Sequence, residues 1–160
     1  MALFQHTIEI QRPVAEVFAF ITEPANYPRW QPTLMAIEPH SPGPLRVGST
    51  ATEVRRFLGR EMQTTWTCVE HEPLTRSAIE SHDGPVPFRG TFDLEPVDGA
   101  TRFTWTVETR GAATRLAGPL VGRATRRELE ASSGRLKELL ESQTAVLADS
   151  LDRTHNDRGA

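Results

Sequence analysis

The chain contains one cysteine, Cys68, and one lysine, Lys137, among its 160 residues. A single cysteine excludes an internal disulfide bond and fits a reducing compartment. Its thiol is most simply a buried structural group, because the nearby His71 lies on the opposite strand face and offers no base. The formal net charge of −3 gives no electrostatic footprint for nucleic acid or for an anionic membrane surface.

Long apolar runs are also absent. No segment approaches the ~18 apolar residues needed to cross a bilayer, and the N-terminus shows no basic region followed by an apolar stretch. We therefore expect a cytoplasmic protein without integral membrane insertion. Apolar residues make up 38% of the chain and charged residues 24%, which is ordinary for one globular domain with a single core.

The usual motifs of metal and nucleotide chemistry are missing as well. The five histidines are scattered without paired metal-ligand spacing, and no glycine-rich phosphate loop, nucleophile elbow or dinucleotide fingerprint is present. We therefore predict neither a metal nor a cofactor. Arg123, Arg126 and Arg127 interleave with Glu128 and Glu130, which indicates a solvated helix face rather than a basic patch.

The most informative stretch runs from Phe4 to Pro32. Residues 4–10 alternate between apolar and polar side chains, which predicts a half-buried strand. Pro13 suits the first turn of a helix, whose apolar residues then recur at helical spacing as far as Ile21. Three prolines next confine Tyr27 and Trp30 to a short, stiff turn or broken helix, where the two aromatic rings either gate a pocket or anchor the turn.

The middle of the chain reads as strands separated by turn signals, and Asp98-Gly99 is the strongest hairpin signal. From about 113 to 146 the apolar period becomes helical, with Leu129, Leu136 and Leu140 on one face. We predict one domain over 1–147 and a polar, disordered tail over 148–160. The strand-rich middle of the chain begins at Leu34, and its strands are predicted at 49–57, 60–70, 75–82, 86–95 and 101–109.

Several short motifs occur in a characteristic order. They are Arg12-Pro13-Val14, Val17-Phe18, Glu23-Pro24, Tyr27-Pro28-Arg29-Trp30, Val47-Gly48-Ser49, Glu70-x-Glu72-Pro73 and Thr101-Arg102-Phe103-Thr104-Trp105. Their order and spacing resemble the START-type helix-grip superfamily, also called SRPBCC, and within it the polyketide cyclase/dehydrase and lipid-transport-like branch. The resemblance implies an α+β fold: a curved antiparallel sheet of six to seven strands wrapped around a long C-terminal helix, with two short helices after the first strand.

Strand parity places large aromatic side chains on one sheet face, opposite small residues of the last helix, which indicates space for an apolar ligand. The predicted ligand contacts are Tyr27, Trp30, Met62, Thr64, Trp66, Phe88, Phe92, Phe103, Trp105, Gly122, Thr125 and Leu129.

Catalysis would need a titratable group in that cavity, and the weak candidates are Glu53, Arg55, His6, Glu80 and His82. His6 reads most simply as a core or rim histidine, whereas Glu80 and His82 fit an exposed strand end. Glu53 and Arg55 share a face, but the inward face of their strand stays open.

The first functional hypothesis is a non-catalytic binder or carrier of a small hydrophobic molecule such as a lipid, polyketide or isoprenoid-like compound. The alternative is an enzyme of the cyclase/dehydrase type, which steers aldol condensation or dehydration through a buried acid or base. Cyclases of the superfamily hold their substrate with an arginine, which strand 60–70 lacks on its inner face, although Arg55 or Arg89 could substitute. A module resembling the chaperone activators ranks third. We expect a monomer or a homodimer.

Overall fold

The computed structural model describes residues 2–111 and 118–156, with side chains described as far as residue 142. In chain order the elements are β1 (Ala2–Ile10), α1 (Val14–Ile21), the 3-10 helix η1 (Pro24–Asn26), α2 (Tyr27–Trp30), β2 (Leu34–Pro39), β3 (Thr50–Phe57), β4 (Arg60–Glu72), β5 (Arg76–Ser81), β6 (Phe88–Val97), β7 (Ala100–Thr109) and α4 (Gly118–Asn156).

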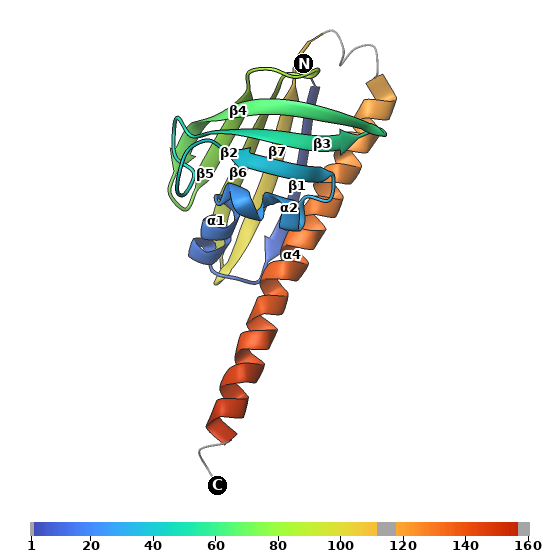
Figure 1. Ribbon diagram of the computed structural model, residues 1–160. Helices are drawn as coiled ribbons and strands as arrows, with labels where there is room; N and C mark the ends of the chain where they lie inside the picture. The colour runs from blue at the N-terminus through green and yellow to red at the C-terminus, as the bar shows by residue number, and fades with distance from the viewer. Residues whose placement is uncertain (1, 112–117, 157–160) are drawn as a thin grey trace.

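The seven strands form one antiparallel sheet in the order β1-β7-β6-β5-β4-β3-β2. Every strand from β2 to β7 pairs with its neighbour in sequence, and β1 adds to β7 at the far edge. The sheet curves around the N-terminal part of α4, while α1 and α2 close one end (Figure 1). The predicted α+β helix-grip fold, with two short helices after the first strand, is confirmed.

The turn after α1 is fixed by aromatic packing. Trp30 is fully buried, and its ring centroid lies 5.6 Å from that of Phe92, 6.3 Å from that of Phe103 and 5.3 Å from that of Trp105. Tilted and edge-on aromatic pairs of this kind contribute about 0.5–1.5 kcal/mol each beyond their burial. Trp30 is therefore an anchor that holds α2 against β6 and β7.

Helix α4 packs along β1 with the predicted apolar stripe. Leu129, Leu136 and Leu140 are all buried. Gly122 faces the ring of Phe4, and a Cβ there would make an ordinary contact of 3.5 Å with that ring. No helix of the described residues is long and apolar enough to span a bilayer.

The helix differs from the prediction at its C-terminal end. It begins at Gly118, directly before Pro119, and the predicted helical residues 113–117 lie outside the described part of the chain. It continues to Asn156, through most of the segment expected to be a disordered tail, and projects away from the sheet (Figure 1). Extending an existing helix gains one hydrogen bond for each residue that is fixed, so it is easier than starting a new helix. Residues 143–156 contain no proline or glycine that would stop it.

The turn of the β6–β7 hairpin allows a direct test of its backbone conformation. Asp98 and Gly99 both have positive φ, of 49° and 80°, in a two-residue turn closed by the Val97–Ala100 pair. Because a Cβ is strained in this conformation, Gly99→Ala is expected to lower the free energy of unfolding by about 1 kcal/mol in a denaturant titration.

The control for this variant is Gly134→Ala. Gly134 lies inside α4, and a Cβ there meets no atom within 4 Å. This substitution is expected to raise the free energy of unfolding by about 0.5–1 kcal/mol. A Gly99→Ala protein as stable as wild type would contradict the left-handed turn.

Candidate functional site

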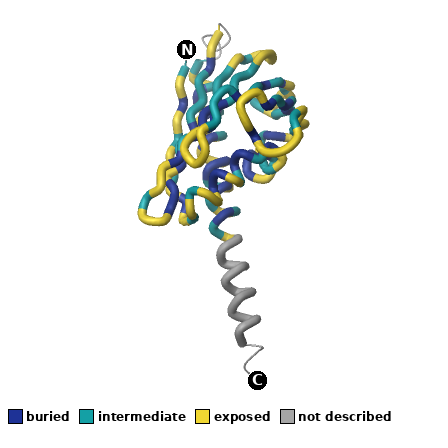
Figure 2. The backbone as a smooth tube through the Cα atoms, turned by 90° about the vertical axis from the view of Figure 1, so that its left-hand side faces the viewer, coloured by how far each residue is buried: buried dark blue, intermediate teal, exposed yellow. Residues whose placement is uncertain are grey.

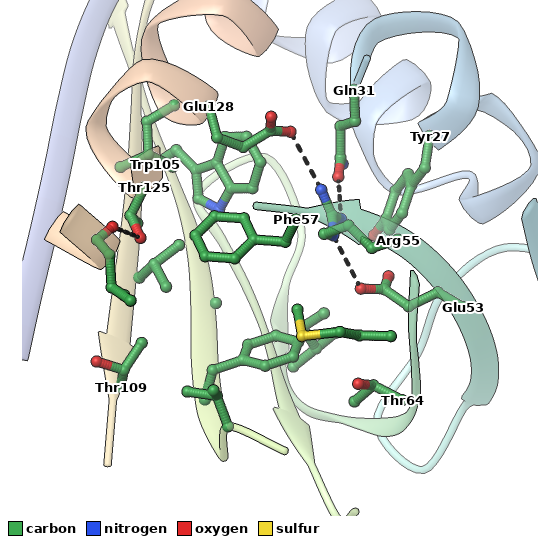
Figure 3. A pocket seen from close by; sticks show the side chains of 18 of the residues that line it. Tyr27, Gln31, Glu53, Arg55, Phe57, Thr64, Trp105, Thr109, Thr125 and Glu128 are labelled. Carbon is green, nitrogen blue, oxygen red and sulfur yellow. Dashed lines mark hydrogen bonds and ion pairs between the residues drawn. The ribbon is translucent and has the colours of Figure 1, made fainter. Parts of the chain in front are cut away.

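A cavity of about 440 Å³ lies between the concave face of the sheet and α4. This volume falls within the ~300–1,000 Å³ typical of small-molecule sites. The wall is mainly apolar, and the strands β3 to β7 and the helix α4 all contribute to it (Figure 3). The principal apolar side chains are Met62, Ile79, Phe88, Phe92, Trp105, Val107 and Leu129.

The cavity opens toward one end of the sheet. Phe57 at the end of β3, Leu58 in the β3–β4 turn and Arg60 at the start of β4 line this end, and the β5–β6 loop contributes Pro85 and Val86. Leu58, Arg60 and Pro85 are exposed at the surface. Figure 2 shows exposed segments mainly in the loops at the edge of the molecule and buried segments inside it. A molecule that enters here would pass an apolar rim with one unburied cation, Arg60.

The predicted contact residues divide into two groups. Tyr27, Met62, Thr64, Phe88, Phe92, Trp105, Thr125 and Leu129 line the cavity. Trp30, Trp66, Phe103 and Gly122 are not part of the lining: the first three pack against other aromatic rings of the core, and Gly122 packs on Phe4. Strand parity identifies the inner face correctly, but it carries no information about which inner side chains are covered by others.

Among the catalytic candidates, Glu53 and Arg55 face the cavity together. The Arg55 Nε–H donates to Glu53 Oε1 at 3.4 Å, and its Nη1 lies 3.1 Å from Glu128 Oε1 (Figure 3). Nη1 also donates to the Thr33 hydroxyl at 2.8 Å, and Nη2 donates to Gln31 Oε1 at 2.7 Å. The guanidinium therefore joins β3, the segment after α2, and α4.

Both carboxylates are further held by neutral donors. The Trp66 indole N–H donates to Glu53 Oε2 at 3.2 Å, and the Ser132 hydroxyl donates to Glu128 Oε1 at 3.0 Å. The side chains of Glu53 and Glu128 are only 5% and 11% exposed. This end of the cavity thus contains two buried carboxylates around one guanidinium.

Tyr27 contributes a polar atom of a different kind. Its ring lines the cavity, but its buried hydroxyl has no hydrogen-bond partner among the described residues. Burial, and after it the negative charge of Glu53, raises the pKa of Tyr27 above its ordinary value. The phenol therefore stays neutral and can donate. Thr109, elsewhere on the cavity wall in Figure 3, has another buried hydroxyl without a hydrogen-bond partner among the described residues.

The remaining catalytic candidates lie away from the cavity. His6 sits opposite Trp105 in the β1–β7 ladder and is half-buried, but it does not line the cavity. Glu80 pairs with Thr67 across the β4–β5 ladder, and His82 is exposed and hydrogen-bonds the Thr67 hydroxyl. Thr67 stands between the buried Trp66 and Cys68, so its face of β4 is the outer one.

Arg89 and Cys68, which were considered above for chemical roles, do not line the cavity either. Arg89 is bound by Glu80 and by Glu70, each at 2.6 Å, on the outer side of the sheet, so it cannot replace the missing cyclase arginine. Cys68 is buried, and burial raises the pKa of its thiol. In the described part of the chain, no three His, Cys, Asp or Glu side chains cluster to hold a metal ion.

Sequence reasoning missed Gln31 and misread Glu128. The arginine cluster indicated a solvated helix face, yet Glu128 is buried against Arg55. The available signal was positional: Thr125, Glu128, Leu129 and Ser132 follow the i, i+3, i+4, i+7 spacing of one helix face. Gln31 carries no such signal, because it lies in an irregular segment.

Comparison with known proteins gives a consistent result. Residues 1–141 match the family described as polyketide cyclase/dehydrase and lipid transport. An uncharacterized protein of Mycobacterium tuberculosis is 28% identical over 123 residues, which cover 73% of this chain and 68% of that relative.

Solved structures show the same fold at low sequence identity. A protein of Thermus thermophilus has a TM-score of 0.77 at 16% identity, covering 89% of this chain and 99% of that chain. A START superfamily protein of Mycobacterium smegmatis has a TM-score of 0.73 at 13% identity, covering 88% and 98%. The di-domain ARO/CYC BexL from the BE-7585A biosynthetic pathway gives 0.70 at 22% identity, covering 88% of this chain and 47% of BexL.

The buried cluster predicts a large stability effect. Arg55→Met would leave Glu53 and Glu128 buried without a cation, so we expect the free energy of unfolding to fall by about 3–5 kcal/mol. Adding Glu128→Gln to Arg55→Met should recover part of this loss, because one uncompensated charge is removed.

The neighbouring Arg56 provides the control. It pairs with Glu61 at the surface, where both side chains are more than half exposed. Arg56→Met is therefore expected to change the free energy of unfolding by about 1 kcal/mol or less. Denaturant titrations of the variants measure all three effects, and equal costs for Arg55→Met and Arg56→Met would contradict the buried cluster.

Proposed function

The chain belongs to the polyketide cyclase/dehydrase and lipid transport family, and from this we propose that it binds a small hydrophobic molecule in the cavity between its sheet and α4. A shared fold does not fix one activity, so the argument depends on the site. The observation that carries it is the apolar cavity of about 440 Å³ with polar groups gathered around Arg55.

The apolar wall supports binding through the hydrophobic effect. Transfer of apolar ligand surface from water contributes roughly 25 cal/mol per Å². Phe88, Phe92 and Trp105 offer rings along the wall, and polar groups around Arg55 can orient the molecule. This is the arrangement expected of a carrier for a lipid, polyketide or isoprenoid-like compound.

The electrostatics of Tyr27 also favour binding over turnover. An efficient general acid has a pKa near the working pH. Burial and Glu53 raise the pKa of Tyr27, so the phenol holds its proton firmly. It can still donate a hydrogen bond to a bound molecule, but it is a poor source of protons for a reaction.

Gly90 allows the cavity to be filled from inside. It lines the cavity, and a Cβ there would make ordinary contacts of 3.6 Å with Ile79 and 3.9 Å with Trp105. Gly90→Leu is expected to weaken binding of the neutral fluorophore 1-aminoanthracene at least tenfold in a fluorescence titration, because the side chain occupies the ligand's space.

Gly90→Ala serves as the matched control. It makes the same backbone change but adds a single methyl group, so binding should stay within about threefold of wild type. The free energy of unfolding of Gly90→Leu should not fall, because the new side chain enters empty space. Binding that is unchanged in Gly90→Leu would place the fluorophore elsewhere.

A second candidate function is dehydration of a β-hydroxy ketone, and the cavity-facing position of Glu53 and Arg55 favours it. The Glu53 carboxylate would take the proton from the carbon next to the carbonyl. A carbon–carbon double bond would form as the β-hydroxyl group takes that proton back from the Glu53 carboxyl group and departs as water. Arg55 would hold Glu53 in place.

The substrate 4-hydroxy-4-(2-naphthyl)butan-2-one tests this candidate, since its dehydration gives a conjugated enone that absorbs in the near ultraviolet. If Glu53 is the base, Glu53→Gln is expected to lower the rate by about 10²–10⁴-fold. The exposed Glu61→Gln is the control and should leave the rate unchanged. A wild-type rate equal to that of buffer would leave only the binding function.

A further inference from the structure

We propose that the polar end of the cavity selects neutral ligands that present a hydrogen-bond acceptor, such as a ketone carbonyl, and rejects carboxylates. The inference rests on the proposed binding function and deepens it, because it names the chemical class of the ligand. Three features of the site carry it: the commitments of Arg55, the local charge and the free hydroxyl of Tyr27.

Arg55 has little capacity left for a ligand. A guanidinium has five N–H donors. Glu53 occupies the donor on Nε, Glu128 and Thr33 accept from Nη1, and Gln31 accepts from Nη2. Four donors are thus committed to the protein. An incoming carboxylate could not form the paired, bidentate contact that makes arginine a strong anion receptor without breaking one of these bonds.

The local charge opposes an anion as well. Glu53 and Glu128 each carry a negative charge against the single positive charge of Arg55, so this buried end has an excess of one negative charge. Like charges repel strongly where water is excluded. The other cavity-lining cation among the described residues is Arg60, which lies exposed at the start of β4, at the mouth.

Tyr27 supplies the attraction. Its ring lines the cavity, and its buried hydroxyl has no partner in the described part of the chain. An unpaired buried donor costs free energy until an acceptor reaches it. Arg55 and Glu53 lie beside Tyr27 in Figure 3, so a carbonyl that accepts from Tyr27 would sit next to the negative cluster. A neutral oxygen tolerates that position and a carboxylate does not.

Three probes of nearly equal shape separate these effects. They are 2-ethylnaphthalene, which has no acceptor, 2-acetylnaphthalene, which has a ketone, and 2-naphthoate, which is an anion at pH 7.5. Calorimetric titration of the wild-type protein is expected to show the ketone binding several-fold tighter than the hydrocarbon and at least tenfold tighter than the anion.

Two variants assign the selection to residues. Tyr27→Phe is expected to weaken ketone binding by about 3–10-fold, the cost of one lost hydrogen bond, and to leave hydrocarbon binding unchanged. Glu128→Gln can still accept from Arg55 and Ser132 but removes one charge, so the ratio of anion affinity to ketone affinity should rise at least fivefold. Circular dichroism checks that both variants fold. If one variant does not fold, the other still tests the proposal by itself.

The mouth requires its own control. An anion could bind in reverse, with its carboxylate at Arg60 and its ring in the cavity, so the three titrations are repeated in Arg60→Gln. Naphthoate that binds within threefold of the ketone in this variant would overturn the selection and leave the proposed function standing. Failure of all three probes to bind wild-type protein would overturn both.

Discussion

The hydrogen bonds of Arg55 are the interaction on which the shape of the cavity depends. They connect β3 through Glu53, the segment after α2 through Gln31 and Thr33, and α4 through Glu128. A sheet and a helix normally stay together by filling the space between them with apolar side chains. Here the hydrogen bonds of Arg55 hold α4 against the sheet at one end, and the buried side chain of Leu136 packs against it further along. The space between these two contacts can therefore remain open.

The fold could be predicted from the sequence because each of its signals is local. Pro13 and the apolar spacing after it set α1, Asp98-Gly99 sets the β6–β7 hairpin, and the stripe through Leu129 sets α4. Such signals depend on backbone preferences and on which face is apolar, and a single chain displays both. The end of α4 was the exception, because polar composition does not stop a helix that has already formed.

The site could be predicted only in part, because it depends on contacts between distant segments. The inward face of β3 was ambiguous, because each face carries an apolar residue. Thr52 and Val54 lie on one face, and Glu53, Arg55 and Phe57 lie on the other. The charged face points inward because its partners come from α4 and from the segment after α2, which no local pattern reveals. Likewise, Trp66 lies on the inner face of β4 as predicted, but its indole N–H donates to Glu53 and is not available to a molecule in the cavity.

The unpaired hydroxyl of Tyr27 also affects the empty protein. A ligand that satisfies this group binds the folded chain and not the unfolded one, so it shifts the folding equilibrium by mass action. Cellular proteases remove chains largely from the unfolded population. The steady-state abundance of a chain that binds such a ligand would then follow the supply of the ligand, without any change in gene expression.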